Sequence, residues 1–236
     1  ASDVYKRQIQ NRMRATIELA IGGWAFAILL GIPTGVLAAV KRGTFWDYIA
    51  RGVAIIGQGA PPFVIGLLLI VIFAVWLQDT PFELPAAGRP PQFNIKTYIL
   101  PCIALGWPAA AGLMRLTRSA MLEVLDSEFV KLARAKGVGW NKVIYKHALK
   151  NALITPLTSA LLLFSGWLNG ALVIEIIFGW PGIGYDALFT AVNDNDFPLL
   201  QGTVFFFVII FVIFALLADL LYTIIDPRVR LTGGEK

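Results

Sequence analysis

The sequence predicts an all-α polytopic membrane protein, and two observations lead to that fold class. Of the 236 residues, 57% are hydrophobic and only 15% are charged, whereas soluble domains carry about 25% charged residues. Five long apolar stretches follow one another along the chain, and each is long enough to cross a bilayer. A single Cys and a single His exclude an internal disulfide and a Cys/His metal cluster. We therefore expect a protein embedded in lipid, with no metal, no cofactor, no catalytic residues and no nucleic-acid partner.

The apolar stretches define one transmembrane domain over residues 15–226. At about 1.5 Å per residue the first stretch reaches about 39 Å, enough to cross a core of about 30 Å with tilt. Gly31-Ile32-Pro33 should kink this span, and the Gly- and Pro-rich residues 57–62 interrupt the second. Small residues at 106–112 predict close approach of the third span to a neighbouring helix. The expected spans cover residues 15–40, 49–77, 98–122, 152–178 and 199–225.

Loop charge predicts the orientation. Lys and Arg gather after the first span, in residues 126–151 and in the tail 227–236, whereas residues 179–198 contain neither. The positive-inside rule then places 126–151 and the C-terminus in the cytoplasm and the acidic loops outside, in a plasma or inner membrane. Five spans would put the N-terminus outside, although residues 1–14 are basic. We therefore expect that a further helix precedes this chain, and that residues 1–14 are a fragment edge or a scar.

Residues 126–151, here called the elbow, form the only long polar segment between apolar spans. Their pattern predicts two short helices joined by Gly137-Val138-Gly139. In the first, Phe129, Leu132, Ala133 and Lys136 share one face, with Asp126 or Ser127 as the cap. Gly137 suits the left-handed stop position.

The second helix of the elbow should begin at Asn141 as N-cap, with Trp140 and Tyr145 placed as a hydrophobic staple. Two short helices held between membrane spans predict a docking surface. From spacing alone, a basic loop lying on anionic lipid is an equally open interpretation.

The elbow resembles the cytoplasmic EAA loop of the permeases of ATP-binding-cassette importers, the binding-protein-dependent transport permease family. Gly137 takes the Gly position of that loop, Ala133 the second Ala and Leu149 the Leu. The departures from the pattern are Lys131 for Glu, Leu132 for the first Ala, His147 for Ile and Lys150 for Pro.

Those departures match the dipeptide/oligopeptide permease branch of the family. Further stretches resemble the same branch, in order and each on its predicted side of the membrane. They are Ala-Arg-Ala-Lys-Gly at 133–137, His-Ala-Leu-Lys-Asn-Ala at 147–152, Leu-Pro-Ala-Ala-Gly-Arg at 84–89, Phe-Gly-Trp-Pro-Gly-Ile-Gly at 178–184 and Asp-Pro-Arg-Val-Arg at 226–230.

The resemblance implies a six-helix, MetI-like permease fold that carries di- or oligopeptides, nickel complexes or glutathione by alternating access. It also implies a second permease subunit, identical or different, two cytoplasmic ATPases and an extracytoplasmic substrate-binding protein. The chain has no Gly-x-x-x-x-Gly-Lys-Ser/Thr loop, so ATP hydrolysis belongs to those separate subunits. The residues expected to couple to the ATPase are Phe129, Leu132, Ala133, Arg134, Ala135, Lys136, Gly137, His147 and Leu149.

Polar residues within the spans have two open interpretations. Gln58, Ser165, Asn169 and Glu175 are candidates for the translocation path, yet such residues more commonly form hydrogen bonds between helices. Charged groups in spans are costly and call for partners, so we expect Asp219 to pair with Arg115 or Arg118. An alternative function is that of a secondary transporter or channel, which needs ion-coupling residues at the membrane midplane and often internal repeats; no repeat is evident.

Overall fold

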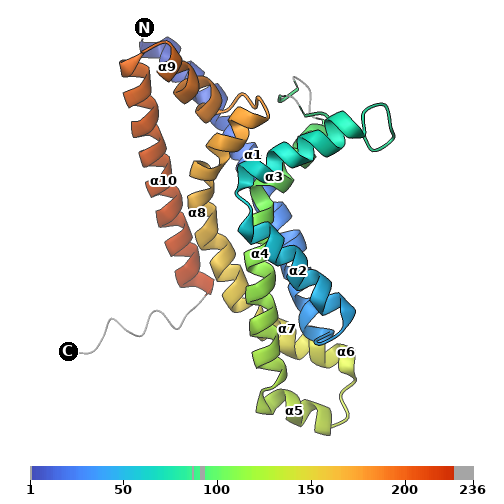
Figure 1. Ribbon diagram of the computed structural model, residues 1–236. Coiled ribbons are helices and arrows are strands. Elements are labelled where there is room, and N and C mark those ends of the chain that lie inside the picture. The colour runs from blue at the N-terminus through green and yellow to red at the C-terminus, as the bar shows by residue number, and fades with distance from the viewer. Residues whose placement is uncertain (1, 87, 91–93, 226–236) are drawn as a thin grey trace, which may run out of the picture. The chain divides into compact units, whose positions relative to one another are not determined.

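The computed structural model describes residues 2–86, 88–90 and 94–225, and these form helices and turns with no strand (Figure 1). Side chains are described for these residues except 2–11, 165–170, 186–188, 190, 206–207, 210–211, 214 and 217–225. The chain divides into two compact units. Unit 1 comprises Ala1–Phe26, Ala60–Trp107 and Phe164–Leu216, and unit 2 comprises Ala27–Gly59, Pro108–Leu163 and Leu217–Lys236. The predicted all-helical fold class is confirmed.

The long helices follow the predicted apolar stretches. They are α1 (Ser2–Val40), α4 (Ile95–Leu125), α8 (Ile154–Ile177) and α10 (Phe197–Ile225). Among the residues searched, Arg12–Val40 and Ile95–Leu125 are long and apolar enough to cross a membrane on their own. Because α1 begins at Ser2, the polar segment predicted as separate is continuous with the first span. The tail 227–236 lies outside the described residues.

The second predicted span is divided at the Gly/Pro segment. It consists of α2 (Phe45–Gly59), α3 (Pro62–Ile70) and a π-helix, η1 (Val71–Trp76), with a break between α2 and α3. Pro61 and Pro62 have no backbone N–H to continue the helix from α2, whereas Pro62 fits the first turn of α3. The predicted span 49–77 is therefore a broken span or a re-entrant loop.

Glycines bring α1 and α4 into close contact within each unit. In unit 1, a Cβ on Gly106 would lie 2.5 Å from the carbonyl oxygen of Gly23. In unit 2, a Cβ on Gly31 would lie 2.6 Å from the carbonyl oxygen of Ala110. The predicted close approach at Gly106 is confirmed. α1 passes Pro33 without ending.

Unit 2 contains the elbow, whose helices are α5 (Glu128–Ala135), α6 (Trp140–Lys142), a π-helix η2 (Val143–Ala148) and α7 (Leu149–Ala152) (Figure 1). An apolar cluster holds the base of the elbow. It joins Ala39 at the end of α1, Met121 of α4, and Ile144, Ala148 and Ala152 of the elbow. The remaining helical segments of unit 1 are the π-helix η3 (Ile183–Phe189) and α9 (Thr190–Asn193).

Candidate functional site

The first arm of the elbow ends in a Schellman motif. Gly137 has φ +78, and its N–H donates to the Arg134 carbonyl at 2.9 Å. The N–H of Val138 donates to the Ala133 carbonyl at 3.2 Å, which completes the motif. A left-handed residue is required at this point, and glycine adopts that conformation without steric cost. The predicted helix stop at Gly137 is confirmed.

The first arm begins at the predicted N-cap residue, but without a hydrogen bond from that residue's side chain to the helix. Ser127 occupies the N-cap position, and its hydroxyl makes no capping bond. Instead the hydroxyl donates to the carbonyl of Val124 at 2.5 Å, one turn back in α4. Ser127 therefore ties the elbow to the end of α4.

The predicted cap of the second arm is wrong by two residues. Gly139, with φ −58 and ψ 142, is the N-cap, and Trp140 is already the first helical residue. Trp140 therefore does not form the predicted staple with Tyr145. Its ring lies under the guanidinium of Arg134, 5.0 Å from the centroid, so the two arms are linked by a cation–π contact.

The elbow exposes large apolar side chains that none of the described residues covers. Phe129 is 45% exposed and Leu132 is 56% exposed, while Val130 is the α5 residue that is buried. Trp140 and Tyr145 of the second arm are also exposed. Lys131 pairs with Glu128 at 2.8 Å, and that carboxylate raises the pKa of Lys131. This combination of a buried anchor and exposed apolar groups is typical of a docking surface.

The predicted coupling residues fall into two groups. Most are exposed on the first arm, and the others are half-buried, with Leu149 packed against the apolar cluster. The exposed ones are Phe129, Leu132, Arg134, Ala135, Lys136 and Gly137, and the half-buried ones are Ala133, His147 and Leu149.

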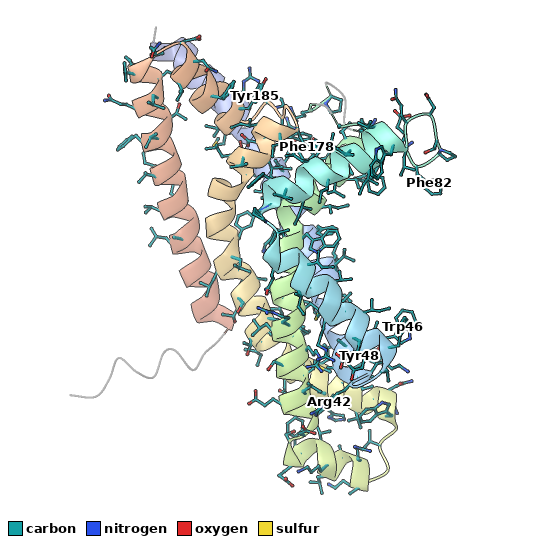
Figure 2. The ribbon with its side chains drawn as sticks, viewed as in Figure 1. Arg42, Trp46, Tyr48, Phe82, Phe178 and Tyr185 are labelled. Atoms are coloured by element: carbon teal, nitrogen blue, oxygen red, sulfur yellow. The ribbon has the colours of Figure 1, made fainter. Side chains whose placement is uncertain are left out.

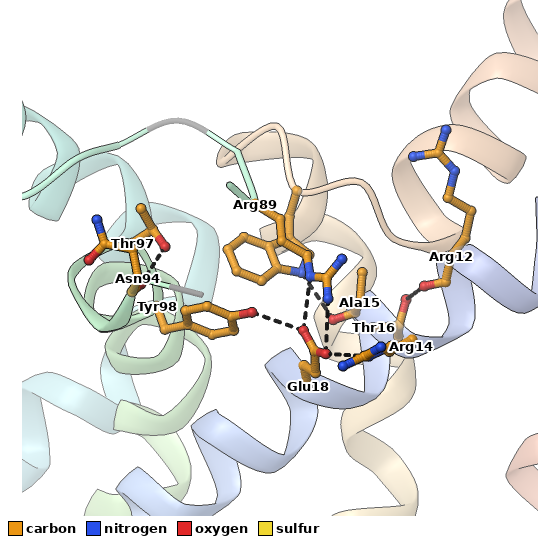
Figure 3. Close-up of polar contacts among 10 residues, drawn as sticks. Arg12, Arg14, Ala15, Thr16, Glu18, Arg89, Asn94, Thr97 and Tyr98 are labelled. Carbon is orange, nitrogen blue, oxygen red and sulfur yellow. Dashed lines mark hydrogen bonds and ion pairs between the residues drawn. The ribbon is translucent and has the colours of Figure 1, made fainter. Parts of the chain in front are cut away.

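A second polar constellation lies in unit 1 around the carboxylate of Glu18 (Figure 3). Arg89 donates to both carboxylate oxygens, from Nε at 2.9 Å and from Nη2 at 3.0 Å. The Tyr98 hydroxyl and the Arg14 Nε each donate at 2.9 Å. A bidentate Arg–carboxylate pair fixes geometry as well as charge. Arg89 of the Leu-Pro-Ala-Ala-Gly-Arg stretch is thereby fastened to α1.

Glu175 is fully buried and binds the other motif stretch of unit 1. Its carboxylate accepts from the Thr16 hydroxyl at 2.6 Å, from the Gly184 N–H at 2.7 Å and from the Tyr185 N–H at 3.3 Å. A Cβ on Gly182 would overlap the same carboxylate. The Gly residues of this stretch therefore leave room for the Glu175 side chain.

The two motif stretches also contact each other. The N–H of Gly88 donates to the Phe178 carbonyl at 2.8 Å. Trp180 is fully buried, donates from Nε1 to the Ala15 carbonyl at 3.0 Å, and packs edge-on against Tyr98 with the ring centroids 4.7 Å apart. Sequence spacing did not predict this convergence, since the segments are far apart along the chain.

A third constellation, in unit 2, centres on Asp47 of α2. Arg118 of α4 donates to both Asp47 oxygens, at 2.8 Å and 3.0 Å, and the Gly43 N–H donates at 3.0 Å. The Asp47 side chain is 1% exposed. Figure 2 labels the exposed side chains of Arg42, Trp46 and Tyr48, which lie within five residues of Asp47 in the chain.

Asp47 was not among the residues predicted from the sequence. Arg118 pairs with Asp47, and the expected pairing of Asp219 with Arg115 or Arg118 stays a prediction, because the Asp219 side chain lies outside the described residues. One sequence signal could have indicated that Asp47 is ion-paired. It is the position of this acidic residue at the start of α2, followed by Arg51 one turn later. Arg51 lies 3.3 Å from the same carboxylate.

The candidates for the translocation path come from two elements, α2 and α8. Gln58 is exposed on α2, beside Gly112 of α4. Glu175 is enclosed within unit 1. The side chains of Ser165 and Asn169, both on α8, lie outside the described residues.

The long apolar helices define a class, the multi-pass membrane proteins, and comparisons with known proteins identify the family. Residues 31–231 match the family described as binding-protein-dependent transport system inner membrane component. The dipeptide transport system permease protein DppB of Alkalihalophilus pseudofirmus is 41% identical over 247 residues, covering 94% of this chain and 73% of that protein. The DppB protein of Escherichia coli K12 is 37% identical over 243 residues, covering 93% and 71%.

Solved structures show the same fold at low sequence identity. A chain of the MetNI methionine ABC transporter, in an inward-facing crystal form, has a TM-score of 0.73 at 16% identity and covers 96% of this chain and 100% of that chain. An amino acid ABC transporter with histidines has a TM-score of 0.68 at 16% identity, covering 94% and 95%.

This chain belongs to the binding-protein-dependent transport system inner membrane component family. It is a membrane-embedded permease subunit of an ATP-binding-cassette importer, a transport component and not an enzyme. The predicted family and permease fold are confirmed. Membership in this family implies ATPase partners.

Proposed function

We propose that this subunit carries di- or oligopeptides, and that its elbow receives the force of ATP hydrolysis by docking on a cytoplasmic ATPase subunit. The observation that carries the proposal is the exposed apolar face of the elbow. Phe129 and Leu132 project from the short helix α5, and the second arm of the same elbow is packed against α1 and α4. Short helices held at one end transmit a displacement as rigid bodies.

Charge around the elbow supports a protein partner with an acidic rim. Arg134 and Lys136 are exposed at the edge of the apolar side chains, and Lys131 is held beside them by Glu128. Exposed charges at a rim steer association and set its orientation, while the apolar centre contributes most of the affinity.

The orientation follows from loop charge. The elbow and the C-terminal tail lie in the cytoplasm, and the stretches that contain Arg89 and Trp180 face outward. A substrate-binding protein delivers peptide to that outer side. The functional unit contains a second permease subunit, identical or different, and two ATPase subunits.

The proposal of a peptide substrate is based on the relatives of this chain. Proteins 37–41% identical to this chain are named dipeptide transport permeases. Nickel complexes and glutathione are the alternatives implied by the shared motifs, and the substrate-binding protein selects among them.

Gln58 and the α8 residues Ser165 and Asn169 remain our candidates for the translocation path. For Glu175, which is enclosed in the single subunit, we propose a contribution through the loop that it holds. Its hydrogen bonds to Gly184 and Tyr185 position the 178–184 stretch.

The test is reconstitution of the subunit with its genetic neighbours in liposomes. We expect ATPase subunits to co-purify with this chain, labelled dialanine uptake to require ATP and the binding protein, and vanadate to abolish uptake. Uptake that persists under vanadate, in a preparation without an ATPase subunit, would instead indicate a secondary transporter.

A further inference from the structure

The buried ion pair of Asp47 and Arg118 joins two helices that the chain connects only distantly. Asp47 lies in the first turn of α2, and Arg118 lies about two turns before the end of α4. The guanidinium donates to both carboxylate oxygens, and the Gly43 N–H adds a third hydrogen bond from the turn after α1. Three segments of unit 2 therefore meet at one carboxylate.

The side of α4 that carries Arg118 also supports the elbow. Met121 follows Arg118 by three residues, so the two side chains are neighbours on the helix surface. Met121 is fully buried in the apolar cluster with Ile144 and Ala148 of the elbow and Ala39 of α1. One turn of α4 thus contacts α2 through charge and the elbow through apolar packing.

We propose that Asp47 is a positioning residue for coupling, which fastens the start of α2 through Arg118 to the turn of α4 that supports the elbow. The inference rests on the proposed docking of the elbow on an ATPase subunit. A push on the elbow displaces Met121 and its helix turn, and the bidentate pair carries that displacement to α2.

The chemistry of the pair suits this task. A bidentate Arg–carboxylate contact resists rotation and sliding in a way that a single hydrogen bond does not. Burial of Asp47 excludes water that would otherwise screen the pair. Arg51 lies 3.3 Å from the same carboxylate and stacks on the Tyr48 ring at 4.8 Å, so the anion is held from its own helix as well.

The test compares transport with hydrolysis in the complete importer, reconstituted with the binding protein and labelled dialanine. Asp47→Asn keeps the shape of the side chain but leaves one oxygen and no charge. Arg118→Lys keeps the charge but removes the guanidinium that contacts both carboxylate oxygens. We expect both to lower uptake per ATP hydrolysed about fivefold or more at equal amounts of assembled complex. The double variant should be no worse than the poorer single variant, because both residues act through one contact.

Glu123→Gln is the matched control, since it neutralises an exposed carboxylate on the same helix as Arg118. This variant should leave uptake per ATP hydrolysed unchanged. ATP-driven uptake by the wild-type complex tests the proposed function separately. The positioning role would be overturned if the two single variants took up as much peptide per ATP hydrolysed as the wild type. It would also be overturned by additive losses in the double variant, or by a loss of assembled complex with no change in uptake per ATP hydrolysed. Failure of both single variants to assemble would do the same, because the pair would then be purely structural.

Discussion

Three carboxylates illustrate how this chain stabilises charge among apolar helices. Glu18 is held by Arg89, Tyr98 and Arg14, and Asp47 is held by Arg118. Glu175 instead accepts from a hydroxyl and from backbone N–H groups. A buried carboxylate without such partners would cost several kcal/mol, so each of these contacts is also a constraint on the local fold.

The residue-scale prediction concerns the space around Glu175. Gly182→Ala places a Cβ against the Glu175 carboxylate, which must then move from the Gly184 N–H. Overpacking of this kind costs about 1–3 kcal/mol, so we expect a lower Tm for the purified protein in detergent.

Gly202→Ala is the control for that variant, because no atom of the described residues lies within 4 Å of a Cβ at Gly202 of α10. Its Tm should equal or slightly exceed that of the wild type. Equal Tm values for both variants would show that the Glu175 network adapts without cost.

At the scale of elements, the elbow is a pair of short helices whose turn depends on one backbone conformation. Gly137 has φ +78, while Gly139 has φ −58, which any residue adopts. The two glycines look alike in the sequence, but only the first is required by the turn.

Gly137→Val should therefore uncouple the importer. A β-branched residue at positive φ costs about 1–3 kcal/mol of strain, which the elbow relieves by changing the angle between its arms. We expect normal membrane insertion, retained ATPase activity and a several-fold loss of peptide uptake.

Gly139→Val supplies the comparison for the elbow variant, since it adds the same side chain two residues away. It should transport at nearly the wild-type rate. If Gly137→Val also transports normally, the turn does not set the geometry of coupling.

A second element-scale prediction concerns the α1–α4 contact. Gly106→Leu would force a side chain against the Gly23 carbonyl and separate the two helices. Close backbone approach is a main source of helix association in lipid, so we expect loss of folded protein, measured as the monodisperse fraction after extraction. Gly52→Leu, at an open position of α2, should leave that fraction unchanged. Similar yields from both variants would argue against a packing role for Gly106.

At the scale of the whole molecule, orientation can be tested with single cysteines in a Cys102→Ser background. Lys142→Cys on the elbow and Asp194→Cys on the loop before α10 both replace exposed residues. The proposed orientation predicts that a membrane-impermeant maleimide labels Asp194→Cys in intact cells and Lys142→Cys only in inverted vesicles. Labelling of both positions from one side would contradict the loop-charge argument.

Sequence patterns predicted the features that depend on local composition. Apolar runs located the helices, the Gly/Pro residues 57–62 located the break, and the glycine at 137 located the end of the first arm. The N-cap of the second arm was predicted wrongly because the asparagine at 141 has a higher intrinsic preference for the N-cap position than the glycine at 139. Gly139 takes that position because the preceding Schellman turn already sets the backbone there.

The sequence by itself determined that this protein lies in a membrane, that it is helical and that it belongs to a transport family. Those properties follow from hydrophobicity and from short motifs, which are local in the chain. Only the tertiary structure decided which charges meet. Arg118 and Asp47, or Arg89 and Glu18, are each 71 residues apart, and spacing cannot pair them because helix packing sets which faces touch. Tertiary structure also decided that the elbow keeps Phe129 and Leu132 exposed, since a different side of the same helix, the one that carries Val130, is buried.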